Sequence, residues 1–187
     1  MQDLIKACKN GDLQAFSGLI DHYSSTVERF AFQIGVPYHD VPDVSQEVFI
    51  RVYRFLYQFD GKSSFTTWLY KITWNAAKDY HRKQSSWLNK FTRLKNDQTK
   101  CNASTDHVEE SIIRDEEDEL LLQCIHQLDE KYRVPIVLHF FHDVPYDQIS
   151  TITGVKLSTI KVRVMRGKKK LAEKLDEEDG KGGIAHG

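Results

Sequence analysis

The chain has 187 residues, of which 40% are hydrophobic and 28% are charged, and its formal net charge at pH 7 is −1. It is long enough to bury one ordinary hydrophobic core or two small ones. No run approaches the roughly 20 apolar residues that a membrane helix needs, and the first nine residues have no apolar stretch behind a basic head, so we expect a cytoplasmic protein.

The N-terminal half has the apolar spacing of three amphipathic helices. Apolar side chains recur at three- and four-residue steps over residues 16–34, before a glycine and a proline interrupt the pattern. An aspartate with a glutamine three residues later predicts the capped start of a second helix over 43–59. A third helix is predicted over 65–80. Trp74 lies off its apolar stripe, so we expect that side chain to be exposed.

Polar and charged residues interrupt the periodicity between residues 84 and 112 and predict a linker. Helical spacing returns near 120–128 and 134–141, and two short helices follow. No stretch alternates convincingly as a strand would. We therefore expect an all-α protein of two small helical domains on a flexible linker, with the boundaries 1–83 for the first domain, 84–112 for the linker, 113–175 for the second domain and 176–187 for a disordered tail.

Residues 146–171 have the spacing of a helix-turn-helix, in which Gly154 allows the tight turn. The second helix of this motif enters the major groove with its N-terminal residues on base edges. A helical hairpin without a DNA role could share the apolar pattern, but basic residues on the exposed face favour DNA binding. The candidate set on that face is Ser158, Thr159, Lys161, Val162, Arg163 and Arg166.

The near-neutral net charge hides an uneven distribution. Residues 156–174 are strongly basic, and a milder basic cluster covers 78–95. The acids that balance them concentrate in 106–119 and 176–179. Two separate basic surfaces suggest two contacts with a polyanion, and the alternative is that these clusters are only solvated helix faces.

The sequence argues against an enzyme. It has no glycine-rich phosphate loop, no nucleophile elbow and no paired carboxylates. His139 and His142 lack the partners that would complete a zinc site, and the three cysteines, Cys8, Cys101 and Cys124, have neither zinc nor disulfide spacing. We therefore expect no catalytic residue, no metal and no cofactor, and buried or inert thiols.

Longer stretches resemble regions 2 and 4 of extracytoplasmic-function sigma factors of bacterial RNA polymerase. The region 2 resemblance rests on 43–51, 59–72 and 75–80, and the region 4 resemblance rests on 128–133, 146–149 and 158–163. Together they cover most of the chain outside the linker and tail. The resemblance implies a protein that binds core RNA polymerase and directs it to promoters.

The resemblance also implies roles for particular residues. The clamp of the polymerase would be bound by Asp43, Gln46, Glu47 and Arg51. A nucleotide flipped from the non-template strand of the minus-ten element would enter a pocket made by Asp60, Gly61, Lys62, Ser63, Ser64 and Phe65. The same element would contact Asn75, Lys78, Asp79 and Arg82. Region 4 would read the minus-thirty-five element with its helix-turn-helix and contact the polymerase flap. A cognate anti-sigma factor is a further expected partner.

Two other classes compete with this interpretation. An ordinary helix-turn-helix regulator would bind its operator unaided, as a dimer on two half-sites, whereas a sigma factor would be a monomer with little DNA affinity until core polymerase is added. A helical protein that binds only other proteins conflicts with the basic recognition helix.

Overall fold

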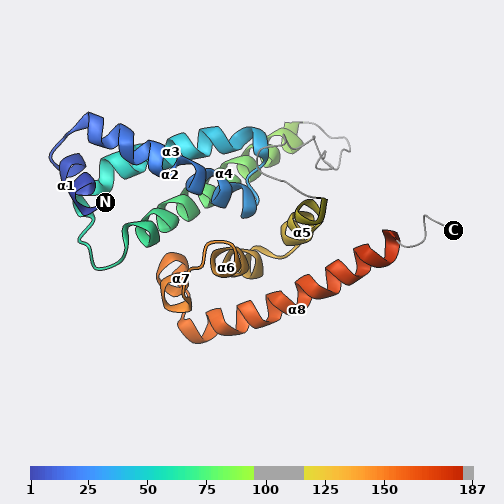
Figure 1. The fold of residues 1–187 in the computed structure, drawn as a ribbon. Helices are drawn as coiled ribbons and strands as arrows, with labels where there is room; N and C mark the ends of the chain where they lie inside the picture. Colours follow the sequence, from blue (N-terminus) through green and yellow to red (C-terminus); the bar gives the residue numbers. More distant parts are fainter. Residues whose placement is uncertain (95–115, 183–187) are drawn as a thin grey trace.

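The computed structural model describes residues 1–94 and 116–182, and this part of the chain contains eight α-helices and no strand (Figure 1). The N-terminal helices are α1 (Gln2–Lys9), α2 (Leu13–Gln33), α3 (Val41–Phe55) and α4 (Phe65–Leu94). The C-terminal helices are α5 (Glu116–His126), α6 (Glu130–Phe140), α7 (Tyr146–Thr153) and α8 (Leu157–Gly182). Short 3-10 turns, Tyr38–Asp40 and Leu56–Gln58, flank α3. The all-α prediction is confirmed.

The N-terminal unit is built on three long helices. Helices α2, α3 and α4 pack on one another, and α1 lies against α2. Their apolar stripes meet in a core where Leu19, Val27 and Phe30 of α2, Val48 of α3 and Leu69 of α4 are almost completely buried. Burying one such side chain stabilises the fold by about 1.5–3 kcal/mol. These three helices are the ones that the periodicity predicted.

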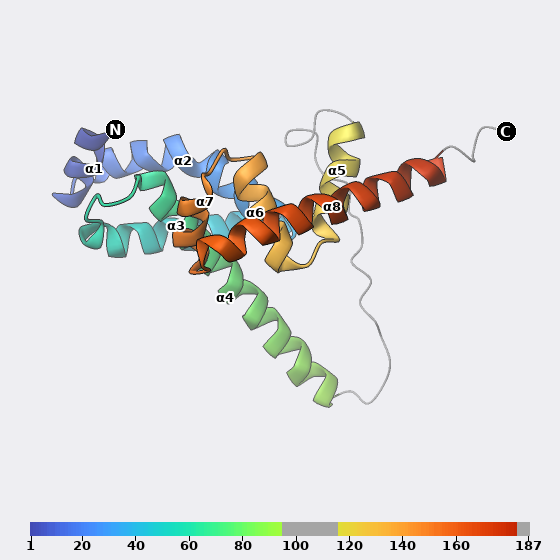
Figure 2. The same cartoon turned by 90° about the horizontal axis from the view of Figure 1, so that it is seen from below.

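The C-terminal unit packs α5, α6 and α7 against α8, which extends beyond them in Figure 2. Ile136, Ile149 and Ile160 are buried where α6, α7 and α8 meet. Helix α8 comes close to α6 at Gly167, where an added Cβ would lie 3.0 Å from Cγ1 of Ile136. The missing side chain therefore allows the approach of the two helices.

Two helices run further than their polar sequences indicated. Helix α4 occupies residues 84–94 of the predicted linker, and α8 occupies 176–182 of the predicted disordered tail. Both stretches continue helices that are already formed, and adding residues to an existing helix costs much less than nucleating a new one. The remainder of both predicted segments, 95–112 and 183–187, lies outside the described residues.

The two helical units contact each other directly, because α7 packs on α4, and α5 and α6 lie against α2 (Figure 1). His142 is central to this contact. Its Nε2–H donates to Oε1 of Gln33 at 2.8 Å, and the hydroxyl of Tyr70 donates to its Nδ1 at 2.9 Å. Because Oε1 of an amide can only accept, Nε2 carries a proton, and the lowered pKa of His142 leaves Nδ1 unprotonated at neutral pH, so that it accepts from Tyr70. The ring also meets the edge of Phe30, with 5.3 Å between ring centres.

Two further hydrogen bonds cross between the units. Nε2 of His126 donates to the carbonyl of Phe32 at 3.0 Å, and the Thr67 hydroxyl donates to Oε1 of Gln148 at 2.7 Å. The side chains of His126 and Gln148 are partly buried, and that of Thr67 is buried. The contact thus adds hydrogen bonds to apolar packing, because buried apolar side chains of both units belong to one cluster.

This contact explains why the prediction for Trp74 was wrong. Trp74 is only 6% exposed. It lies one turn after Tyr70, on the face of α4 that turns toward His142. The apolar stripe in the sequence marks the core of the N-terminal unit alone, whereas α4 also buries a second face.

Acid should loosen the contact between the units. Burial lowers the pKa of His142 from 6.5 to about 4, with a further lowering by Arg29 that Asp143 opposes. The opened arrangement therefore binds a proton more readily than the closed one. We expect the contact to keep its full strength above pH 6.5 and to weaken as the pH falls from 6.5 toward 4.

Hydrogen exchange of the α7 amides in the full chain measures this opening as a function of pH. The matched control is His142→Gln, which retains hydrogen-bonding capacity but does not titrate. His81 and His126, whose pKa values burial also lowers, are present in both proteins, so the difference between them isolates His142. Identical pH profiles for the two proteins would contradict the assignment.

Candidate nucleic-acid and protein interfaces

Helices α7 and α8 form the predicted helix-turn-helix. Gly154 ends α7 in the left-handed conformation with φ 73°, as the turn requires. The Ser150 hydroxyl donates to the carbonyl of Val155 at 2.6 Å and ties α7 to the turn. The buried side chains of Ile149 and Ile160 join the two helices. The start of α8 is therefore held firmly against its supporting helix.

The six candidate residues of α8 share its outward face. Arg163 is half-buried, and the other five are exposed. Val162, with 41% of its surface accessible, adds an exposed apolar side chain to this face. Within the described residues, Lys161, Arg163 and Arg166 form no ion pair, so their charges are available to an anionic partner.

Further along α8, the lysines contact the protein itself. Lys174 donates to Oε1 of Gln127 at 2.9 Å, Lys169 lies 3.7 Å from Glu173, and Lys170 lies 5.9 Å from the ring centre of Tyr132. The basic segment thus has two parts. The open basic row at the start of α8 consists of Lys161, Arg163 and Arg166, whereas the lysines nearer the C-terminus contact other residues of the protein.

The N-terminal unit has a cleft of about 830 Å³ between α1, the start of α4 and the loop that joins α3 to α4. The predicted set Asp60 to Phe65 forms one wall. The Asp60 carboxylate accepts a hydrogen bond from the backbone N–H of Lys62 at 3.1 Å. It also forms an ion pair with Nζ of Lys62 at 2.8 Å. These bonds lower the pKa of Asp60 below its ordinary value. Gly61, with φ 74°, makes the sharp turn between them.

The loop ends at Ser64, whose Oγ accepts the backbone N–H of Thr67 at 3.0 Å and so caps α4. Phe65 is buried, with ring centres 5.2 Å from Tyr23 and 5.6 Å from Phe59. An aromatic cluster therefore underlies the cleft, and Phe65 belongs to it rather than to the exposed surface.

The four candidate residues of α4 follow the helix away from the cleft. Lys78 and Arg82 are exposed, and Asn75 and Asp79 are half-buried. Nζ of Lys78 lies 5.2 Å from the ring centre of Trp74. Arg82 lies 3.0 Å from the Asp79 carboxylate. The two cations give this face a positive surface despite the aspartate.

Arg51 connects this face to α3. Its Nε donates to Glu47 at 2.7 Å, and a terminal nitrogen lies 2.9 Å from the Asp79 carboxylate. Arg51 and Glu47 are half-buried, whereas Asp43 and Gln46 are exposed. Helix α3 begins at Val41, so Asp43 lies in its first turn and makes no side-chain cap. The four candidates nevertheless share the polar side of α3.

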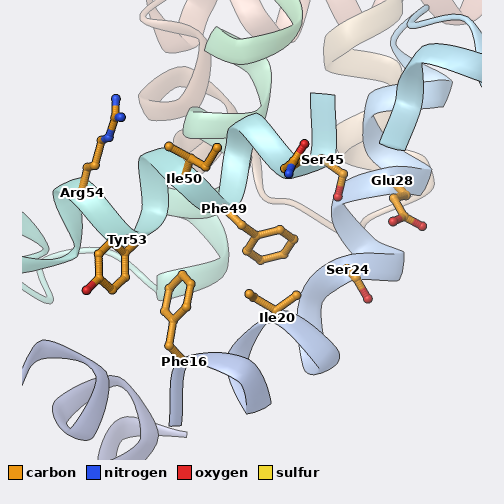
Figure 3. Close-up of a pocket in the computed structure, with 10 residues that line it drawn as sticks. Phe16, Ile20, Ser24, Glu28, Ser45, Phe49, Ile50, Tyr53 and Arg54 are labelled. Carbon is orange, nitrogen blue, oxygen red and sulfur yellow. The ribbon is translucent and has the colours of Figure 1, made fainter. Parts of the chain in front are cut away.

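An apolar groove that the sequence analysis missed adjoins this polar side. It measures about 650 Å³, lies between α2 and α3, and includes Gln46 in its lining (Figure 3). Its apolar residues are Phe16, Ile20, Phe49, Ile50 and Tyr53. Ile50 is 39% and Tyr53 54% exposed, and the Tyr53 ring meets Phe16 with 5.1 Å between centres.

A signal for this groove was present in the sequence. The stripe of Val44, Val48 and Val52 already provides α3 with a core face, and Ile50 and Tyr53 are apolar positions in excess of it. Such an excess on an amphipathic helix indicates a second apolar contact.

The two histidines once considered for zinc have other partners: Nδ1 of His139 donates to the Val144 carbonyl at 3.2 Å, and His142 binds Gln33 and Tyr70. Cys8 and Cys124 are buried, as expected, while Cys101 lies outside the described residues. Among the helices that the structure describes, none combines the length and apolar character needed to cross a membrane.

Two solved structures share this fold. One is the structure of CnrH in complex with the cytosolic domain of CnrY, with a TM-score of 0.68 and 23% identity over 93% of this chain and 96% of that one. The other is the sigma factor RpoE in complex with the anti-sigma factor NepR from Bartonella quintana, with a TM-score of 0.68 and 18% identity over 86% of this chain and 96% of that one.

Sequence comparisons identify the family. The family model for Sigma-70 region 2 matches residues 19–86, and that for Sigma-70 region 4 matches residues 118–171. The chain is 30% identical to the ECF RNA polymerase sigma-E factor of Haemophilus influenzae over 93% of this chain and 94% of that protein. Identity to the sigma-E factor of Escherichia coli is also 30%, over 93% of both chains. The chain therefore belongs to the extracytoplasmic-function sigma factors, non-catalytic proteins that direct RNA polymerase to promoters.

Proposed function

We propose that this sigma factor recognises a promoter with two surfaces and binds core polymerase with a third. The observation that carries the proposal is the open basic row at the start of α8. There, Lys161, Arg163 and Arg166 have no ion-pair partner in the described part of the chain and lie beside an exposed Val162. Arginine and lysine pair with guanine edges, and valine contacts a thymine methyl, so this face suits major-groove recognition of the minus-thirty-five element.

The second surface is the cleft of the N-terminal unit together with the outer face of α4. Promoter opening exposes unpaired bases, and a protein that holds an extruded base offsets a few kcal/mol of the unstacking cost. The cleft walled by Asp60 to Ser64 suits this task. Asn75, Lys78, Asp79 and Arg82 continue the surface along α4 toward the rest of the minus-ten element.

The third surface is the polar side of α3 with the adjoining apolar groove. Interfaces between proteins combine a buried apolar centre with a polar rim. Ile50 and Tyr53 would form the centre, and Asp43, Gln46, Glu47 and Arg51 the rim, against the clamp of the polymerase. Region 4 contacts the flap in this proposal. We keep the proposed boundaries 1–83 and 113–175 for the two domains, which compare with matched regions at 19–86 and 118–171.

The closed arrangement in the structure cannot contact both promoter elements. By their names, the two elements lie about 25 base pairs apart, or about 85 Å of B-form DNA. Helix α8 packs on α7, and α7 packs on α4, so two interaxial distances of about 8–10 Å place the axes of α8 and α4 no more than about 20 Å apart where they pack, far less than about 85 Å. We infer that the units separate when the factor binds polymerase and DNA, and that polymerase then fixes their spacing.

We place this action in the cytoplasm, where RNA polymerase works. A cognate anti-sigma factor is a further proposed partner, because both solved relatives above were captured with a partner protein, and one of these partners is named as an anti-sigma factor.

Alanine substitutions in the recognition helix, α8, test the first surface. Lys161→Ala or Arg163→Ala should cost roughly 1–3 kcal/mol of promoter affinity and relax selectivity at one upstream position. The measurement is binding of reconstituted holoenzyme to promoters with a randomised minus-thirty-five element. Lys174→Ala is the matched control, since Lys174 donates to Gln127. Equal weakening on every sequence would instead assign these side chains to phosphates.

Substitutions in the apolar groove test the third surface. Ile50→Ala combined with Tyr53→Ala should weaken binding to core polymerase by more than about 1 kcal/mol, as truncation of a central interface residue does. Titration of labelled core enzyme measures the affinity. Tyr57→Ala is the control, because Tyr57 is 71% exposed and does not line the groove. Unchanged affinity of a folded double variant would exclude the groove from the interface.

A crosslink between the units tests the inferred opening. Cysteines at Thr67 and Gln148, joined by a short bismaleimide in a Cys101→Ser background, should abolish promoter-directed transcription by holding α7 against α4. The two single-cysteine variants, treated with the same reagent, should stay active. Full transcription by the crosslinked protein would show that the closed form is competent.

A further inference from the structure

Helix α1 has no assigned role, because the region 2 match begins only at residue 19. It nevertheless forms the wall of the cleft that faces the loop Asp60 to Ser64, and both lie at the same end of the molecule (Figure 1). Ile5, Lys6 and Lys9 of α1 line the cleft. Any nucleotide held by the loop would therefore also lie beside α1.

The charge in this cleft is not balanced. Asp60 is the one carboxylate in its lining, and it is paired with Lys62 at 2.8 Å. Lys6 and Lys9 are exposed and form no ion pair with any residue that the structure describes. The α1 wall therefore carries two uncompensated cations opposite a neutralised loop, which favours an anionic ligand.

The floor of the cleft has a different chemistry. It is lined by three aromatic side chains, Tyr23, Phe59 and Phe65. The Phe65 ring makes a tilted contact with Tyr23 and an edge-to-face contact with Phe59. Nζ of Lys9 donates to the Phe59 carbonyl and lies 5.5 Å from the Phe59 ring centre. An apolar aromatic floor beside two cations matches a nucleotide, whose base is flat and apolar on its faces and whose phosphate is anionic.

The fold fixes α1 in this position. Ile5 and Cys8 are buried, and Leu4 lies over Gly18, where an added Cβ would be 3.9 Å from its Cδ1. Gly11, with φ 87°, reverses the chain, and Asp12 caps α2 by accepting the backbone N–H of Gln14 at 2.9 Å. The two lysines are thus presented from an anchored helix.

We propose that α1 is a DNA-binding element, in which Lys6 and Lys9 bind the phosphates that flank the unpaired nucleotide in the cleft. This inference rests on the proposed function of the loop and adds the second wall of the site. Lysine is suited to a phosphate as a point charge, so α1 contributes affinity for the strand, while the loop and α4 provide its sequence selectivity.

The test uses holoenzyme reconstituted from the full chain and core polymerase. The probe is a fluorescent single-stranded oligonucleotide with the non-template minus-ten sequence, and its affinity is measured by anisotropy at increasing salt concentration. The variant is Lys6→Gln with Lys9→Gln. Each phosphate contact contributes about 0.7 to the slope of log affinity against log salt for a single strand, so the slope should fall in magnitude by about 1.4.

The matched control is Lys131→Gln with Lys174→Gln, which removes the same charge from α6 and α8 and should leave the slope unchanged. Lys6→Arg with Lys9→Arg, which keeps both charges, should retain the wild-type slope. If the glutamine variant weakens binding without changing the slope, the lysines act only by holding the loop and the inference is overturned. A wild-type slope and affinity in that variant overturn it as well.

Failure of the proposed loop function gives a different result. In that case the wild-type holoenzyme itself would not distinguish the minus-ten strand from a scrambled one of equal length. If the wild-type holoenzyme prefers the minus-ten strand and the Lys6→Gln, Lys9→Gln variant binds that strand as the wild type does, the loop assignment stands. Only the proposed role of α1 is then rejected.

Discussion

The imidazole of His142, between α6 and α7, docks the C-terminal unit of this sigma factor on the N-terminal one, because it hydrogen-bonds both Gln33 of α2 and Tyr70 of α4. A neutral hydrogen bond contributes only about 1 kcal/mol net, and the contact has few of them. The contact also includes a cation that is incompletely hydrogen-bonded. The guanidinium of Arg133 lies against Gly35, and its Nε has no hydrogen-bond partner within the described residues. Unlike the core within either unit, the contact therefore depends in part on hydrogen-bonded and charged side chains.

Cations exceed unpaired acids at each proposed DNA surface. Lys161 and Lys6 face outward and have no ion-pair partner among the described residues, while Asp60 is neutralised by Lys62, and Asp79 by Arg51 and Arg82. The net charge of −1 conceals this arrangement, because the remaining acids lie elsewhere in the sequence. Local electrostatics, rather than total charge, makes a polyanion a suitable ligand.

Sequence periodicity predicted what depends on neighbouring residues along the chain. The turn at Gly154, the buried Ile149 and Ile160 and the outward face of α8 all follow from helical spacing and backbone freedom. It did not predict the burial of Trp74 or the groove at Tyr53, because both depend on which helix packs against which. It also ended α4 and α8 too early, since a polar helix has no buried face to reveal its period. The residues proposed for the minus-ten element and for the polymerase clamp came from the resemblance, whereas the six on α8 came from the helix-turn-helix spacing.

Arg51 has a consequence for communication within the N-terminal unit. One guanidinium binds both Glu47, on the side of α3 proposed to meet polymerase, and Asp79, on the side of α4 proposed to face the DNA strand. A partner that attracted Glu47 or Arg51 would change how fully Asp79 is screened, and so would alter the repulsion that an approaching DNA backbone experiences there. Binding to polymerase would then change the affinity of α4 for unpaired DNA. The link would be the charge of Arg51, and the main chain would not have to move.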